Sequence, residues 1–297
     1  MANLEQKIDF IGFITVNRAN PNGDPLNGNQ PRTDYENYGE ISDVCLKRKI
    51  RNRLQDLGGK ILVQSDDRCD DGYDSIRSRV DGNERVGGIL KSKEKNKDQL
   101  FYAAACREWT DVRSFGQVFA FTKAAGIDAV SIGVRGPVSI HTAVSLDPVL
   151  TTSMQITKSV NGEPGEKKGS DTMGMKHRVD FGVYKMQGSI NVQLAEKTGF
   201  TAEDAQKIKQ ALITLFENDA SSARPEGSVE MTRLYWITHT NKTGSVPSSN
   251  IHQGVTASLA AGIDAPKKFG DYQFDESRLQ NIAGITIEKY QDAQLVN

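Results

Sequence analysis

The stretch Ile8-Asp-Phe-Ile-Gly-Phe-Ile-Thr-Val16 decides how the rest of the chain is interpreted. Its β-branched and aromatic side chains leave no polar face, which is typical of a strand that is covered on both sides. The strand leads directly into residues 17–32, where closely spaced Asn, Gly and Pro disfavour regular structure. We therefore expect a central strand that ends in an irregular loop.

A helix is predicted after this loop. Ser42 or Asp43 provides the N-cap, and the helix runs to about Leu57, where Gly58-Gly59 ends it. Apolar residues recur at helical spacing, so one side of this helix is expected to pack against the strand. The buried stripe consists of Leu46, Ile50, Leu54 and Leu57.

The other faces of the helix are basic. Residues 42–60 contain six basic and two acidic residues, and none of them is Glu. Lys47 and Arg51 project from one face about 6 Å apart along the axis, which is comparable to the spacing of neighbouring phosphates. A helix face that is merely solvated usually mixes Glu with Lys. We therefore interpret this helix as a phosphate-binding ridge, with a solvated face as the alternative.

The pattern of charged and apolar residues changes twice in the middle of the chain. Residues 65–99 contain nine acidic and eight basic residues with almost no apolar periodicity, so we expect a solvated, partly mobile insertion. A short helix is expected over residues 100–109. Residues 130–146 then alternate in polarity, which predicts a half-buried strand or strand pair with a bend at Gly136-Pro137.

A glycine-rich segment separates this strand from the next. Residues 158–178 contain four glycines, five basic and three acidic residues, and they predict a protruding loop or hairpin. A strand is expected over 179–194, and a capping box at Thr201 opens a second helix. Residues 229–240 form a last strand, and the tail after Gly244 is rich in Ser, Gly and Pro and then mixed.

The order of these elements predicts the fold. Without its insertions the chain reads β-α-β-β-α-β, which is the α+β plan of ferredoxin-like and RRM-like domains. RRM proteins often read RNA with aromatic residues on the sheet, but the sequence fingerprint for that mode is absent. Any bound RNA is therefore expected along the first helix and its loop.

Composition limits the class of protein. The chain has 297 residues, with 37 Lys and Arg against 38 Asp and Glu, so its net charge is −1. This excludes a globally basic nucleic-acid binder but not a local basic face. The three cysteines lie far apart, as expected for free thiols in a reducing cytosol. Since the first apolar stretch is too short to span a bilayer, we expect a cytoplasmic protein without a membrane partner.

No catalytic motif stands out, so we predict no enzymatic activity, no cofactor and no metal. The four histidines lack metal-ligand spacing, and the aspartates between 66 and 74 are read as a solvated cluster. Asp24 and Asp34 are the candidate residues for the alternative function, a metal-dependent ribonuclease. Carboxylates in a loop after the first strand could hold a metal for phosphodiester cleavage. We favour turn formation for both residues, because a sequence typical of turns needs no metal to explain it.

The hairpin at 158–178 leaves two further alternatives open. Its returning residues, from Met173 to Arg178, could wedge between bases of an RNA, or they could form an oligomer contact. A plain oligomeric scaffold that binds no nucleic acid is the third hypothesis for the protein as a whole.

Several motifs together resemble a known family. Residues 14–25, Ile-Thr-Val-Asn-Arg-Ala-Asn-Pro-Asn-Gly-Asp-Pro, are similar to the CRISPR-associated backbone subunit of the type I Cascade complex, within the RAMP superfamily and most like the type I-C branch. The resemblance continues in residues 43–51, 110–116, 135–138 and 173–182, in the order that the family has them.

The resemblance implies an RRM-like palm (1–59, 128–149 and 179–297), a finger-like insertion (60–127) and a thumb hairpin (150–178). Copies would polymerise along CRISPR RNA as a non-catalytic backbone and present guide segments for pairing with target DNA. Other expected partners are the RAMP subunit that processes the guide, the large subunit and the small subunit. The implied RNA-binding residues are Asn17, Arg18, Asn20, Ser42, Lys47, Arg48, Arg51, Arg113, Arg135, Met175, Lys176 and His177.

Overall fold

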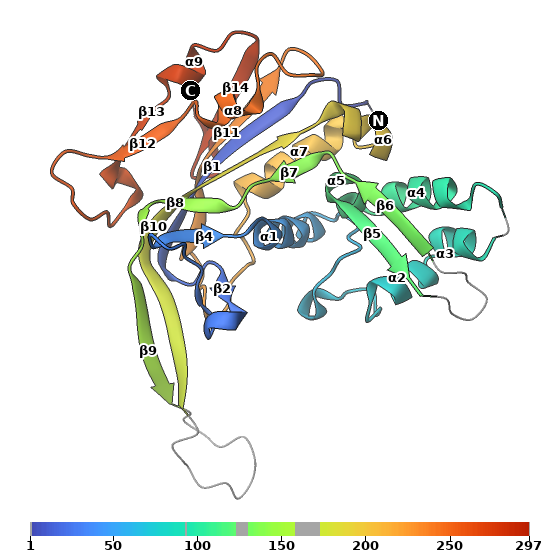
Figure 1. Cartoon of the computed structure of the whole chain (residues 1–297), viewed down its shortest axis with the longest axis horizontal. Coiled ribbons are helices and arrows are strands. Elements are labelled where there is room, and N and C mark those ends of the chain that lie inside the picture. The colour runs from blue at the N-terminus through green and yellow to red at the C-terminus, as the bar shows by residue number, and fades with distance from the viewer. Residues whose placement is uncertain (1, 93, 123–129, 158–172, 297) are drawn as a thin grey trace, which may run out of the picture.

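A computed structural model describes residues 2–92, 94–122, 130–157 and 173–296. It shows a mixed α/β protein built on a large antiparallel sheet (Figure 1). The strand order in this sheet is β15-β14-β11-β1-β10-β8-β4, and β7 and β9 also pair with β10. The bounds of these strands are β1 Ile8–Ala19, β4 Tyr38–Ile41, β7 Val138–Ile140, β8 Ala143–Pro148, β9 Thr151–Thr157, β10 Met173–Ile190, β11 Val229–His239, β14 Ile285–Gln291 and β15 Gln294–Val296.

Strand β1 occupies the centre of this sheet, as its sequence predicts. It lies between β10 and β11 and pairs antiparallel with both. Phe10 and Ile14 are buried on one face, while Ile11 and Phe13 are buried on the other. The loop after β1 is irregular apart from the short elements β2 Gly23–Asp24, η1 Pro25–Asn27 and β3 Gln30–Pro31.

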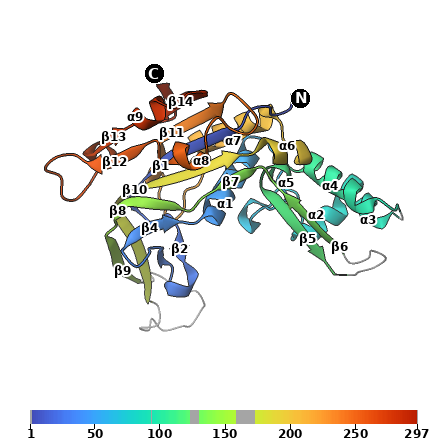
Figure 2. The same ribbon diagram turned by 45° about the horizontal axis from the view of Figure 1, so that its top comes forward.

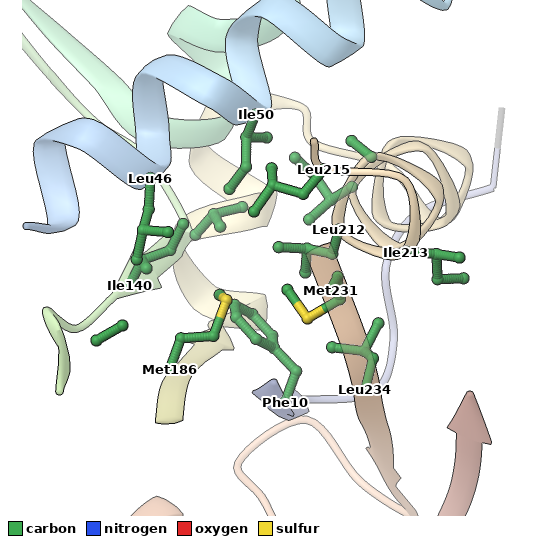
Figure 3. Close-up of a cluster of buried hydrophobic side chains, with 14 of the residues drawn as sticks. Phe10, Leu46, Ile50, Ile140, Met186, Leu212, Ile213, Leu215, Met231 and Leu234 are labelled. Atoms are coloured by element: carbon green, nitrogen blue, oxygen red, sulfur yellow. The ribbon is translucent and has the colours of Figure 1, made fainter. Parts of the chain in front are cut away.

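Two helices cover the Phe10 face, and both were predicted. They are α1 Asp43–Asp56, capped by Ser42, and α7 Ala202–Ile213, opened by the capping box at Thr201. Figure 3 shows Ile50 of α1 turned toward Leu212 and Leu215 near the end of α7, and Leu46 of α1 beside Ile140 of β7. Leu57 is 42% exposed, contrary to the prediction, because it already lies at the C-cap outside the buried stripe.

Residues 61–92, 94–121 and 130–135 form a helical lobe beside α1 (Figure 1). Most of the described side chains of 65–99 are exposed or half-buried, as predicted for a solvated insertion, but Val80, Val86 and Leu90 are buried in a second core with Phe101 and Phe119, which was not predicted. Each helix is too short for apolar periodicity to stand out. The lobe comprises η2 Asp66–Arg68, α2 Ile76–Gly82, α3 Glu84–Lys91, α4 Lys97–Glu108, α5 Thr110–Phe115, β5 Gly116–Phe121 and β6 Val130–Arg135.

The strand pattern predicted over 130–146 is divided between two sheets. Strand β6 pairs with β5 in the helical lobe, whereas β7 and β8 join the large sheet. The bend predicted at Gly136-Pro137 separates the two parts. The alternation also shifts after Ile140, where Ala143 is buried and Val144 is exposed, because β7 and β8 are separate strands.

A two-stranded ribbon projects from the sheet in both views (Figure 1 and Figure 2). It consists of β9 paired with residues 173–179 of β10, and we call it the β9–β10 ribbon. Of the predicted loop 158–178, residues 158–172 lie outside the described part, and the rest is strand. The strand predicted over 179–194 ends at Ile190, because the Asn191 side chain accepts a hydrogen bond from Leu194 N and starts a helix.

The tail after residue 244 is structured, which the sequence did not indicate. Residues from α8, β12, β13 and α9 cover the Phe13 face and form a third core with Tyr235 and Ile237. The additional elements are α6 Val192–Thr198, α8 Ser248–His252, β12 Thr256–Leu259, η4 Phe269–Asp271, β13 Tyr272–Asp275 and α9 Ser277–Gln280.

Cys45, Cys69 and Cys106 are all free thiols. Among the described residues, no helix is both long and apolar enough to cross a membrane.

A buried carboxylate ties the C-terminal layer to β1. Asp9 Oδ2 lies 2.7 Å from His239 Nε2 and 3.5 Å from Lys7 Nζ, and His252 Nε2 lies 3.6 Å from Asp9 Oδ1. His239 Nδ1 accepts a hydrogen bond from Ser245 N, so its Nε2 carries the proton that is donated to Asp9. Burial opposes ionisation of Asp9, but the bond from His239 and the nearby cations outweigh it and lower its pKa.

His252 makes this arrangement sensitive to acid. Burial lowers the pKa of His252 below its ordinary 6.5, against the raising effects of the Gly188 carbonyl and Asp9, while His141 and Lys185 lower it further. The unfolded chain therefore takes up a proton at this histidine before the folded chain does.

We predict that the free energy of unfolding falls as the pH is lowered from about 7 to about 5, and falls further as Asp9 is protonated below about pH 4. The substitution His252→Gln should flatten the first part of this curve, because the titrating group is gone. Chemical denaturation at a series of pH values measures both. A slope that H252Q leaves unchanged would contradict the assignment.

Candidate nucleic-acid interface

The polar face of α1 borders a groove of about 840 Å³. Its walls come from four segments: residues 21–23, the α1 side chains from Cys45 to Asp56, residues 65–70 of the helical lobe, and residues 218–224. The helical lobe and the β9–β10 ribbon lie on opposite sides of α1 (Figure 1). Of the residues that the sequence singled out for RNA binding, Arg48 lines this groove.

The cations of α1 are largely engaged by acceptors from elsewhere in the chain. Lys49 is buried against Asp219, and Arg53 contacts Glu217 and donates to Thr214 Oγ1 at 2.7 Å. The absence of Glu from the helix therefore does not leave its cations unpaired. The partners of Lys49 and Arg53 lie more than 150 positions away, where a test of i,i+4 spacing cannot find them.

Arg51 forms the joint between α1 and the helical lobe. Its Nε donates to Asp111 Oδ2 at 3.0 Å, and its guanidinium lies 5.0 Å from the centroid of the Phe115 ring. Asp111 is fully buried and also accepts hydrogen bonds from Leu62 N at 2.8 Å and Val63 N at 3.1 Å. One carboxylate therefore holds two backbone donors of the lobe and one side chain of α1.

Arg113 forms a second joint between the lobe and α7. It donates two hydrogen bonds to the Asp204 carboxylate, at 2.7 and 3.0 Å, and Asp204 also closes the capping box with Thr201. Such bidentate pairs are among the strongest charged hydrogen bonds. Arg113, which was predicted to bind RNA, thus holds the helical lobe against α7.

Lys47, Arg48 and Ser42 stay closer to the surface. Lys47 pairs at 2.9 Å with the partly exposed Asp43, an i,i+4 pair of a kind that contributes little to stability. Arg48 donates to the Val63 carbonyl at 2.6 Å, and burial lowers the pKa of its guanidinium, but the residue still lines the groove. Ser42 caps the helix beside Asn22.

The predicted residues at the end of β1 separate into two kinds. Asn17 and Arg18 are exposed, and Arg18 has a left-handed backbone with φ of 51°. Asn20 is buried and donates to the Asn29 carbonyl at 2.8 Å, so it stabilises the loop. Arg135 is exposed at the far end of β6, away from these three.

The β9–β10 ribbon presents the remaining predicted residues on alternating sides. Met175 is 56% exposed, and His177 on the same side lies 2.7 Å from Ser153 Oγ. Lys176 points to the opposite side, where it pairs in register with Met154. The ribbon therefore offers apolar and basic side chains on both of its sides.

The carboxylates considered for metal binding support local turns. Asp24 Oδ1 accepts from Leu26 N at 3.2 Å and lies 3.4 Å from Arg32, while Asp34 Oδ1 accepts from Glu36 N and Tyr38 N. Within the described ranges, no group of three His, Cys, Asp or Glu side chains could hold a metal.

The loop before α1 is acidic, a signal that sequence analysis could have found. Residues 20–43 contain five carboxylates and one arginine. Such a surface repels phosphates.

Comparison with known proteins gives a consistent set of relatives. The family model for CRISPR-associated protein Cas7 matches residues 6–277. A CRISPR-associated protein Cas7 from Haloferax volcanii is 27% identical over 230 residues, which cover 73% of this chain and 65% of that relative. The matched region thus spans just under two thirds of the relative's length.

Two solved structures are also similar at 16% identity. A chain of a CRISPR RNA-guided surveillance complex, pre-nicking, has a TM-score of 0.46, with 78% of this chain and 75% of that chain covered. A chain of another CRISPR RNA-guided surveillance complex has a TM-score of 0.38, with 78% and 68% covered.

We predict that Arg51→Ala lowers the free energy of unfolding by about 3 kcal/mol, because it leaves the buried Asp111 carboxylate without its charged partner. Lys47→Ala should cost less than about 0.5 kcal/mol, since an exposed pair contributes little. Urea denaturation measures both. Equal losses for the two variants would contradict the different roles assigned to these neighbouring cations.

Proposed function

The chain belongs to the Cas7 family of CRISPR-associated proteins, and on that premise we propose that it binds CRISPR RNA as the backbone subunit of a type I Cascade surveillance complex, most like the type I-C branch. Copies polymerise along the RNA and present guide segments for pairing with target DNA. The observation that carries this proposal is the family match, which extends over residues 6–277 and includes every segment that lines the groove.

In this proposal the core of the chain is an RRM-like palm. In support of it, the elements β1, α1, β7, β10, α7 and β11 follow one another in the order β-α-β-β-α-β. Their strands are arranged as β11-β1-β10-β7 and pair antiparallel throughout, which is the arrangement of a ferredoxin-like sheet.

The helical lobe and the β9–β10 ribbon correspond to the proposed finger and thumb. We extend the finger from residue 127 to residue 135, because β6 pairs with β5 rather than with the large sheet. The thumb keeps its boundaries of 150–178, with β9 and the start of β10 as its described part.

We infer that the RNA backbone follows the outer side of α1. Lys47 and Arg48 supply the accessible charge, and Asn17, Arg18 and Ser42 supply contacts at the end of β1 and the start of α1. Met175, Lys176 and His177 reach the RNA from the thumb, and Arg135 reaches it from the finger. Arg51, Arg113 and Asn20 position these elements without contacting RNA: Arg51 pairs with the buried Asp111, Arg113 pairs with Asp204, and Asn20 donates to the Asn29 carbonyl.

Such contacts suit a protein that must accept any guide sequence. Phosphate contacts fix position without reading bases, and specificity is left to base pairing. A net charge of −1 also suits a subunit that packs against its own copies, because copies with almost no net charge repel one another only weakly.

We propose that this subunit does not cleave RNA, and that guide processing belongs to another RAMP subunit. Asp24 and Asp34 hold the backbone of their own turns. Magnesium-dependent cutting of bound RNA that Asp24→Ala or Asp34→Ala abolishes would instead establish the alternative function, a metal-dependent ribonuclease. The large and small subunits complete the proposed partners, in the cytoplasm.

The salt dependence of RNA binding tests the proposal. The double variant Lys47→Gln with Arg48→Gln should reduce the slope of log K against log salt by about 1.4, or about 0.7 for each lost phosphate contact on a single strand. Lys197 and Lys207, which are exposed on α6 and α7, provide the matched control K197Q/K207Q, for which the slope should not change.

Fluorescence anisotropy with a labelled single-stranded RNA at several salt concentrations gives these slopes. A slope that K47Q/R48Q leaves unchanged would contradict the path along α1. A wild-type protein that binds no RNA would instead support a plain oligomeric scaffold.

A further inference from the structure

A second, smaller groove lies at the end of α7. It has a volume of about 250 Å³ and lies between the end of α7, the start of β11 and the turn that joins β14 to β15. Figure 3 shows Ile213 on the side of α7 away from Ile50. Among the described residues, none lines both this groove and the groove beside α1, so the two are separate surfaces. The floor is apolar and consists of Ile213, Leu215, Val229 and Met231, all buried.

The groove runs along a strand edge that has no partner in the described part of the chain. Strand β11 pairs with β1 from Val229 onward, but β14 pairs with β11 only from Arg233 onward. Asp292 N still donates to the Thr232 carbonyl at 3.0 Å, and the chain then turns away into β15. The outer side of residues 229–231 is therefore open to an added strand.

The hydrogen bonds to β1 show which backbone groups of this edge are free. Asn17 N donates to the Ser228 carbonyl at 2.8 Å. Backbone groups of an antiparallel strand point alternately to its two neighbours, so those of Glu230 also point to β1. Val229 and Met231 then present their backbone groups to the groove, and each offers one N–H donor and one C=O acceptor.

The side chains along this edge alternate as well. Val229 and Met231 are buried in the core that α7 covers, whereas Glu230 points to the other face and is exposed. A strand added here would place every second side chain over the apolar floor and the side chains between them beside Glu230. The groove therefore suits a segment in which apolar and polar side chains alternate.

The rim of the groove is acidic, which decides the charge of the polar side chains. Glu226, Glu230 and Asp292 line the groove and are exposed. The cations of neighbouring elements have other partners, namely Asp219 for Arg224, Glu288 for Lys209 and Gln291 for Arg233. Basic side chains would compensate the three carboxylates, whereas acidic ones would be repelled.

We propose that this groove binds an extended segment of a different protein, in which apolar and basic side chains alternate, as an added strand beside the start of β11. In this mode of recognition, main-chain hydrogen bonds to an open edge supply affinity, and pockets for alternate side chains supply specificity. A symmetric contact between two copies would bring their acidic rims together, which opposes it. The inference goes beyond the proposed function, because no RNA takes part in it.

Peptide binding tests the proposed chemistry. The probe is a fluorescently labelled seven-residue peptide of alternating valine and lysine, and fluorescence anisotropy measures its binding to the full chain. A peptide of the same composition with its valines in one block should bind about tenfold more weakly, because it cannot place valines on the floor and lysines at the rim in alternation. An alternating peptide of valine and glutamate should not bind, because its charge matches that of the rim.

N-methylated versions of the probe test the strand pairing itself. In an extended chain, the N–H groups of the valines point to one side and those of the lysines point to the other. An added strand bonds to β11 through one of these sides. Methylation of one set should therefore weaken binding about tenfold, while methylation of the other set should leave it unchanged.

Variants of the protein locate the site. E226Q/E230Q/D292N removes the charge of the rim and should bind the probe about tenfold more weakly. Asn tolerates the left-handed backbone of Asp292, which has φ of 48°. The matched control E5Q/E94Q/D264N neutralises three exposed carboxylates elsewhere and should bind like the wild type. Equal midpoints of thermal unfolding show that both variants are folded.

Failure of the wild type to bind the alternating valine–lysine peptide would overturn the proposal, and so would wild-type affinity in the rim variant. Equal affinities of the two methylated peptides would exclude strand addition. Self-association of the RNA-free wild type that the rim variant abolishes, as counted by mass photometry, would assign the groove to a second copy instead. A wild type that binds the probe but no RNA would refute the proposed function alone.

Discussion

The buried carboxylate of Asp111 is the contact on which the arrangement of this molecule depends. It accepts hydrogen bonds from Leu62 N and Val63 N at the start of the helical lobe and from Arg51 of α1. Burying a charge is unfavourable unless it is paired and hydrogen-bonded, so these donors are needed together. Because α1 is itself packed on the sheet through Leu46 and Ile50, the same contact fixes the lobe relative to the sheet. The groove beside α1 therefore has walls of fixed position.

The contact between Arg51 and Asp111 changes how the basic residues of α1 are interpreted. A ridge of cations on one helix suggests phosphate binding throughout, yet the residues nearest the lobe and the 218–224 loop are used to hold the fold together. Lys47, which pairs with Asp43, and Arg48, which lines the groove and donates to the Val63 carbonyl, stay closer to the surface. The acidic loop over residues 20–43 borders the same region and restricts the path further.

The sequence predicted those parts of the fold in which one continuous stretch of residues contains the whole pattern that identifies the element. The two-sided apolar run of β1, the stripe of α1 and the capping box at Thr201 each contain their own signal, and each was found where expected. The helical lobe was missed because its core is assembled from single residues such as Val80, Val86 and Leu90 on separate short helices. The roles of Arg51 and Arg113 were hidden for the same reason, since Asp111 and Asp204 are distant in sequence. The convergence of His239 and His252 on Asp9 shows no spacing pattern at all.

The most direct measurement of the central claim is a photo-crosslink between the protein and bound RNA. Val44 is 67% exposed at the start of α1, and a photoreactive amino acid at that position should crosslink to RNA in the assembled complex. The same amino acid in place of Asp264, which is exposed between β12 and β13 of the C-terminal layer, should give no crosslink. Crosslinking from Asp264 but not from Val44 would show that the polynucleotide lies on the opposite face and would contradict the account.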